Sequence, residues 1–170
     1  MKRCLARLLL LVPFSILIIL MAHNTRSQNL PAVGTGRPSA SNTKNSPAKS
    51  ALKKLPPAIA GQVKLVFVTT DPERDSPAVL RRWLDLFDRH FIGLTGTERA
   101  IEAVERAAGV PVAVKTGLAS GNYAVSHANF VVAYSKDNLA HVIYPGGISK
   151  DDWVHDLPIL IWERWMRRPD

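Results

Sequence analysis

The chain has 170 residues, which is enough for one domain with a tail. Its net charge is +8, but nine basic and no acidic residues lie in the first 57 positions, so residues 58–170 hold 13 basic and 14 acidic side chains. A globular nucleic-acid binder concentrates Lys and Arg on its folded part, so this distribution argues against nucleic acid as a partner.

The only cysteine is Cys4, which excludes a thiol–disulfide enzyme built on this domain. The sequence has no P-loop, GxGxxG, HExxH or GxSxG motif, and we predict that the protein is not an enzyme.

Residues 8–22, LLLLVPFSILIILMA, follow Lys2, Arg3 and Arg7 and carry no charge. A basic segment before an apolar one is typical of a signal peptide. The small residues of a good cleavage site are missing, which favours an uncleaved anchor over a removed signal. We therefore predict a membrane helix within residues 1–22, with the domain on the periplasmic, non-cytoplasmic side.

Residues 23–50 are mostly Asn, Thr, Ser, Pro, Gly, Ala and Lys. Such a segment has too little apolar surface to offset its ordering entropy. We predict a disordered linker here.

The first half of the predicted domain begins with Val63–Thr70, a nearly continuous apolar and β-branched run. That pattern favours a central strand buried on both faces. Ser76 is a good N-cap and Pro77 a good first helical residue. The helix they begin has an apolar face at i, i+3, i+4 and i+7, formed by Leu80, Trp83, Leu84 and Phe87. Phe91–Leu94 is the next strand.

The second half begins with a helix that we expect to start at Thr97 and stop at Gly109. Two strands, Phe130–Tyr134 and Leu139–Tyr144, are joined by a short polar link that predicts an antiparallel hairpin. A last helix begins at Ser149, with Asp152 completing a capping box, and Pro158 should kink or end it. The order β-α-β-α-β-β-α predicts an α/β domain with a mixed sheet.

Several separated segments resemble the SCO/SenC family of thioredoxin-fold copper chaperones, and they occur in the family's order. They are Val63–Asp75 (VKLVFVTTDPERD), Phe91–Thr97 (FIGLTGT), Tyr123–His127 (YAVSH) and Tyr144–Gly147 (YPGG) with the helix after it.

The resemblance implies a membrane-anchored domain outside the cytoplasm that delivers copper to the dinuclear centre of cytochrome c oxidase. In that family two thiolates of a Cys-x-x-x-Cys motif and one distal histidine hold copper, and the histidine matches His127. Soft thiolates suit Cu(I), and imidazole accepts both copper oxidation states. The implied cofactor is therefore copper, and the implied partner is an oxidase subunit or another assembly factor.

The sequence departs from the family pattern upstream of the matched strand. The motif cysteines and the strands before them have no counterpart, because residues 51–62 resemble only the end of the helix that follows the motif. We therefore predict an incomplete thioredoxin-like domain over residues 51–170, with its N-terminal strands missing. A shortened relative and a gene model that joins an anchor to a partial domain would both give this pattern. An unpaired position beside Val63–Thr70 would invite association, so we expect a homo-oligomer or a strand supplied by a partner.

The candidate metal ligand is His127, which without the two thiolates should bind copper weakly; the alternative is an ordinary histidine at a strand edge. Asp71, Arg74 and Asp75 follow the central strand, where sites of α/β proteins collect, but turn and capping chemistry with an Arg–Asp pair is the favoured interpretation. The alternative function is a non-metal interaction protein or an inactive relative. Two further groups have a weaker case: Trp162 and Trp165 as a partner surface, and His90, His141 and His155, whose spacing indicates no site.

Overall fold

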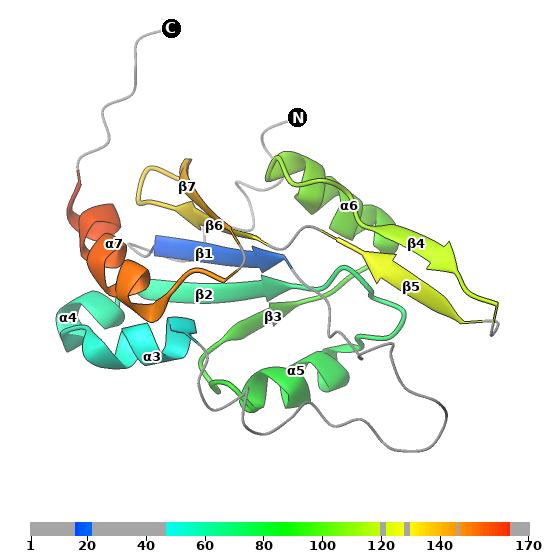
Figure 1. Cartoon of the computed structure of the whole chain (residues 1–170), viewed down its shortest axis with the longest axis horizontal. Helices are drawn as coiled ribbons and strands as arrows, with labels where there is room; N and C mark the ends of the chain where they lie inside the picture. The colour runs from blue at the N-terminus through cyan, green and yellow to red at the C-terminus, as the bar shows by residue number, and fades with distance from the viewer. Residues whose placement is uncertain (1–15, 22–46, 120–121, 128–129, 146, 164–170) are drawn as a thin grey trace, which may run out of the picture.

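The computed structural model of the chain describes residues 16–21, 47–119, 122–127, 130–145 and 147–163. Its elements, shown in Figure 1, are β1 (Ile16–Met21), α3 (Pro47–Lys54), α4 (Pro57–Ala60), β2 (Val63–Val68), α5 (Pro77–Asp85), β3 (Ile92–Leu94), α6 (Glu98–Ala107), β4 (Val114–Gly117), β5 (Tyr123–Ser126), β6 (Phe130–Tyr134), β7 (Ala140–Pro145) and α7 (Lys150–Trp162).

β1 lies in the middle of a five-stranded mixed sheet whose order is β3–β2–β1–β6–β7. It runs parallel to β2, with Ile16 opposite Val63, and antiparallel to β6, with Ile19 opposite Val132. The blue strand in Figure 1 is therefore flanked on both sides. Its backbone groups are paired in both directions, as a buried strand requires.

The predicted membrane helix is wrong for Ile16–Met21, which form this strand; the rest of residues 1–22 lies outside the described residues. The physical reason is that a six-residue apolar run rich in isoleucine fits a buried strand as well as a helix, and periodicity cannot separate the two. None of the helices in the described part of the chain is long and apolar enough to cross a membrane.

The predicted gap beside the central strand is also wrong. β2 was expected over Val63–Thr70 with one side unpaired, whereas it ends at Val68 and has β3 on one side and β1 on the other. Its place as a buried central strand is confirmed. Because β1 covers the side that was expected to be open, the reason for expecting a partner strand or self-association there disappears.

Helices cover both faces of the sheet, as the alternation along β2 and β6 requires. On one face, Leu65 and Phe67 of β2 pack against α5, and Val131 and Ala133 of β6 pack against α3, α4 and α7. On the other face, the intervening residues of both strands pack against α6; they are Val66, Val68, Val132 and Tyr134. Figure 1 shows α6 separated from α3, α5 and α7 by the sheet.

The predicted helix starts are confirmed. The Ser76 side chain accepts a hydrogen bond from the Val79 N–H, with Pro77 as the first helical residue. The Thr97 side chain accepts from the Ala100 N–H, and Gly109 takes the left-handed conformation, with φ +70°, that ends α6. Ser149 and Asp152 form the predicted capping box of α7.

One local prediction was wrong, one of two alternatives for Pro158 is excluded, and one element was not predicted. The linker predicted over residues 23–50 ends earlier, because α3 begins at Pro47 and buries Ala51 against α7. Pro158 does not end α7, which continues to Trp162 with buried Leu157 and Leu160 on either side of the proline. Packing of these apolar residues outweighs the hydrogen bond that proline removes. The hairpin of β4 and β5, a separate two-stranded sheet, was not predicted, since β4 is short and mostly exposed.

A proline in β1 tests the central strand. Ile18→Pro removes an N–H that a doubly paired strand uses and leaves a buried acceptor unsatisfied, so we expect the free energy of unfolding to fall by about 1–3 kcal/mol. Urea unfolding of the full chain measures this, and Ile18→Val is the matched control because it keeps a β-branched strand residue. An unfolding curve for Ile18→Pro that overlays the wild type would show that β1 is not part of the sheet.

Candidate functional site

The turn after β2 and the hairpin of β4 and β5 meet at the carboxyl end of β2. This end of an α/β sheet is where ligands and catalytic groups gather. The turn contributes Asp71, Glu73 and Arg74, and the hairpin contributes Lys115 and Tyr123. The two segments are far apart in sequence, so their contacts define the candidate site.

Thr69 fixes the shape of the turn. Its hydroxyl donates to Oδ2 of Asp75 at 2.6 Å and accepts from the Asp71 N–H at 3.0 Å. The Thr95 hydroxyl donates to the Asp75 carbonyl at 3.1 Å, which ties the turn to the segment after β3. Burial raises the pKa of Asp75 even though the hydrogen bond from Thr69 opposes that shift. The Asp75 carboxyl is thus an internal brace of the turn, 5% exposed.

Tyr123 connects the hairpin to the turn. Its hydroxyl lies 2.9 Å from Oδ1 of Asp71 and 3.0 Å from Oε2 of Glu73. Burial, followed by these two carboxylates, raises the pKa of Tyr123 to about 12. The phenol therefore stays protonated at physiological pH and shares one proton between two acceptors, so it serves as a donor and not as a base.

Arg74 of the turn also binds the hairpin, through contacts with Asn122 and Tyr123. Nη2 donates to Oδ1 of Asn122 at 2.6 Å and to the Tyr123 carbonyl at 2.7 Å. The guanidinium carbon lies 3.7 Å from the centre of the Tyr123 ring, a cation–π contact. Nε is 3.5 Å from Oδ2 of Asp71, so the predicted Arg–Asp pair of the turn is confirmed. Its role in holding the hairpin was not predicted.

Lys115 of β4 extends the charged network to α6. Its Nζ lies 2.9 Å from Oε1 of Glu98 and 3.2 Å from Oε1 of Glu73. The hydrogen bond to Glu98, and then that to Glu73, raises the pKa of Lys115. The ammonium group is therefore held between the helix and the turn.

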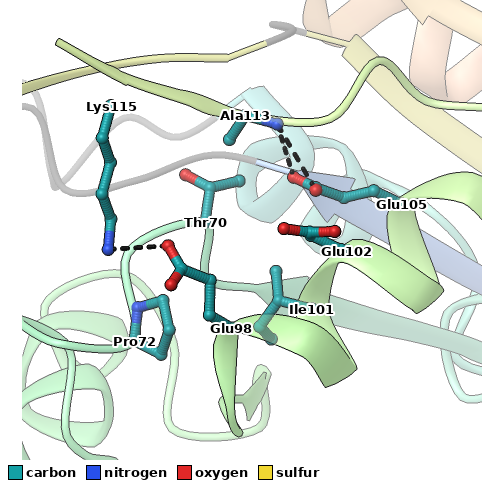
Figure 2. Close-up of a pocket in the computed structure, with 8 residues that line it drawn as sticks. All are labelled: Thr70, Pro72, Glu98, Ile101, Glu102, Glu105, Ala113 and Lys115. Carbon is teal, nitrogen blue, oxygen red and sulfur yellow. Dashed lines mark hydrogen bonds and ion pairs between the residues drawn. The ribbon is translucent and has the colours of Figure 1, made fainter.

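Glu105 is the buried acid of this region, with 1% of its surface exposed. Its two carboxyl oxygens lie 3.3 and 3.4 Å from the Ala113 nitrogen, whose N–H they accept, as Figure 2 shows. Burial raises the pKa of Glu105, and the Ala113 N–H offsets this only in part. This acid was missed from the sequence, although Glu98, Glu102 and Glu105 lie at the spacing of one helix face.

Among the residues that the structure describes, His127 does not belong to any cluster of metal ligands. His127 follows β5 and is half-buried, and it already interacts with other groups of the protein. Nowhere in the described part of the chain do three or more His, Cys, Asp or Glu side chains group so that they could hold a metal ion. His90, His141 and His155 each lie beside one aspartate, Asp88, Asp137 and Asp156 respectively.

Comparison with known proteins identifies the family of this fold and site. The model of the family described as SCO1/SenC matches residues 35–161, well over half of the chain. The chain belongs to the SCO1/SenC family. Its matched residues include the turn, the hairpin with Tyr123, and His127.

Individual relatives give the extent of the likeness. An SCO2-like protein of Rickettsia bellii is 38% identical over 91 residues, which are 53% of this chain and 46% of that protein. The chain thus matches about half the length of that relative.

Solved Sco structures share the mixed α/β, thioredoxin-like fold. Apo Sco1 from Thermus thermophilus has a TM-score of 0.69 and 28% identity, covering 86% of this chain and 79% of its own. ScoI of Bradyrhizobium japonicum, solved with copper bound, has a TM-score of 0.63 and 23% identity, covering 86% and 85%. The second likeness shows the fold alone.

Removing the Tyr123 hydroxyl tests the link between turn and hairpin. Tyr123→Phe leaves two carboxylates without this donor, one of them the buried Asp71, so the free energy of unfolding should fall by about 1–2 kcal/mol. Tyr134→Phe is the matched control, because the Tyr134 hydroxyl has no hydrogen-bond partner among the described residues and only burial raises its pKa. Equal urea midpoints for the two variants would contradict the proposed link.

The pH dependence of stability tests Glu105. Its pKa is raised in the fold, so the native state keeps the proton longer than the unfolded chain, and stability falls as pH rises from about 4.5 through the folded pKa. Glu105→Gln should remove that fall, and should raise the melting temperature at pH 7 more than at pH 4. Exposed Glu163→Gln is the control. If both variants give the same pH profile as the wild type, the carboxyl of Glu105 is not buried as described.

Proposed function

We propose that this SCO1/SenC protein takes part in assembling the copper centre of cytochrome c oxidase, and that it does so mainly by binding other proteins. The observation that carries the second part is the lack, in the described residues, of any group of side chains around His127 that could hold a metal ion. The first part rests on family membership. Its partner would be an oxidase subunit or another assembly factor.

Copper chemistry supports the limited role for metal. Cu(I) prefers soft sulfur ligands, and one imidazole cannot close a site by itself. The sequence has one cysteine, Cys4, and His127 is the only residue here that matches a copper ligand of the family pattern. The residues present therefore do not fit a tight copper site, and no step of the proposed role depends on copper bound by this chain alone.

The surface at the carboxyl end of the sheet supports a docking role. Hydrogen bonds, ion pairs and a cation–π contact hold acidic and basic side chains in fixed positions on this surface. They join Asp71, Glu73, Arg74, Lys115 and Tyr123. Such preorganised polar groups lower the ordering cost of association, and complementary charges increase association rates.

A second surface favours the alternative of an interaction protein with no role in copper handling. Trp162, near the end of α7, is 63% exposed. Lys136 Nζ lies 5.7 Å from the centre of its ring. Exposed tryptophan beside a basic residue is typical of interface anchors. Trp165, the other half of the predicted partner surface, lies outside the described residues.

We also propose that the domain works on the non-cytoplasmic side of a membrane. The support is the basic segment Lys2, Arg3 and Arg7 before an apolar one, the layout of an export signal. Residues 16–21 cannot serve in β1 and cross a bilayer at the same time. In an exported, folded chain they would therefore lie in the sheet and not in the membrane. Protection of the full chain from protease added outside the cytoplasm would overturn this location.

Cu(I) titration tests the proposed weak metal binding. In competition with a Cu(I) chelator, the full chain carrying Cys4→Ser should bind no more tightly than expected for scattered surface histidines. His127→Ala should change the apparent affinity by less than about threefold, as should the control His90→Ala, whose side chain is 87% exposed. Stoichiometric, tight binding that His127→Ala abolishes and His90→Ala leaves intact would refute the proposal and favour copper delivery.

A further inference from the structure

A cavity of about 80 Å³ lies between α6, the end of β2 and the start of β4. Its lining, drawn in Figure 2, consists of Thr70, Pro72, Glu98, Ile101, Glu102, Glu105, Ala113 and Lys115. A single water needs about 10–15 Å³ by this kind of measure, so the cavity has room for a small group of several atoms.

The Thr70 hydroxyl is the feature that points to a ligand. Thr70 is 5% exposed, and its Oγ1 has no hydrogen-bond partner among the described residues. Thr70 lines the cavity, and Figure 2 shows its oxygen on the side of Lys115 and its methyl group on the side of Glu105. A buried hydroxyl without a hydrogen-bond partner is destabilising, so a ligand group that bonds to it would gain affinity.

The carboxylates around Thr70 have more acceptor capacity than the protein fills. Glu98 is paired with Lys115 at 2.9 Å. Among the described residues, Glu102 has only a distant pair, with Arg106 Nη2 at 3.8 Å. Both oxygens of Glu105 share one long hydrogen bond from Ala113. Hydrogen-bond acceptors and negative charge therefore remain in excess, so a fitting ligand must bring donors and positive charge.

We propose that this cavity binds the ammonium group of a lysine side chain from a partner protein. An ammonium group has three N–H donors, and the lining of the cavity offers acceptor oxygens on Thr70, Glu102 and Glu105. The apolar lining from Pro72 and Ile101 suits the methylene stem. The rim is open to solvent, since the side chains of Glu98 and Glu102 are 59% and 45% exposed. A metal ion is a poorer fit, because no group of described residues can hold one.

The proposal does not depend on copper or on the oxidase partner. It predicts that Nα-acetyl-lysine-N-methylamide, a blocked lysine, binds the full chain. Titration followed by the amide resonances of Ala113 and Lys115 should give saturable shifts. Methylammonium chloride should give the same shifts with weaker affinity, because it lacks the stem. Tetramethylammonium chloride and magnesium chloride at equal ionic strength should give none, since neither offers N–H donors.

Variants separate the cavity from general charge attraction. Thr70→Val removes the hydroxyl at constant shape and should weaken blocked-lysine binding about tenfold, while leaving the melting temperature unchanged or higher. Glu102→Gln should weaken binding as well, whereas exposed Glu163→Gln should leave it unchanged. Equal binding by the wild type and Thr70→Val would overturn the proposal. So would shifts produced equally by magnesium or tetramethylammonium, or binding of methylammonium without binding of the blocked lysine.

Discussion

The backbone pairing of β1 between β2 and β6 is the constraint on which the rest of the fold depends. Helices pack against both faces of the sheet, so water cannot satisfy the facing edges of these two strands if β1 leaves. Unsatisfied buried N–H and C=O groups cost about 1–3 kcal/mol each. The strand that lies between β2 and β6 has six residues. The domain therefore needs a strand in that position, and the apolar segment near the N-terminus supplies it.

The position of β2 in turn sets the candidate site. Because β2 is held on both sides, its carboxyl end delivers the turn from Thr69 to Asp75 at a fixed place. Tyr123 and Arg74 then attach the hairpin of β4 and β5 to that turn. Two contacts then attach the hairpin to α6. Lys115 of β4 pairs with Glu98 of α6, and the Ala113 N–H, just before β4, donates to Glu105 of α6. The site is thus a set of polar contacts between segments remote in sequence, built on a sheet that needs β1.

Local signals in the sequence predicted much of this fold, and contacts between distant segments account for the rest. Ser76, Thr97 and Ser149 act within three residues of themselves, so their caps could be recognised directly. The strand formed by Ile16–Met21 could not be, because its conformation depends on two strands more than 40 residues away. The same holds for Tyr123, whose acceptors lie 50 and 52 residues earlier. The family resemblance identified the fold, but it could not show that Ile16–Met21 fill the central position.

Hydrogen exchange of the backbone amides in Ile16–Met21 tests the central strand most directly. In the intact chain at neutral pH, peptides covering β1 should exchange as slowly as those covering Val63–Val68, because both strands open only when the whole sheet unfolds. The two sets should also lose protection together as urea is added. Exchange of β1 within seconds, while β2 stays protected, would contradict the account and would mean that the sheet forms without this strand.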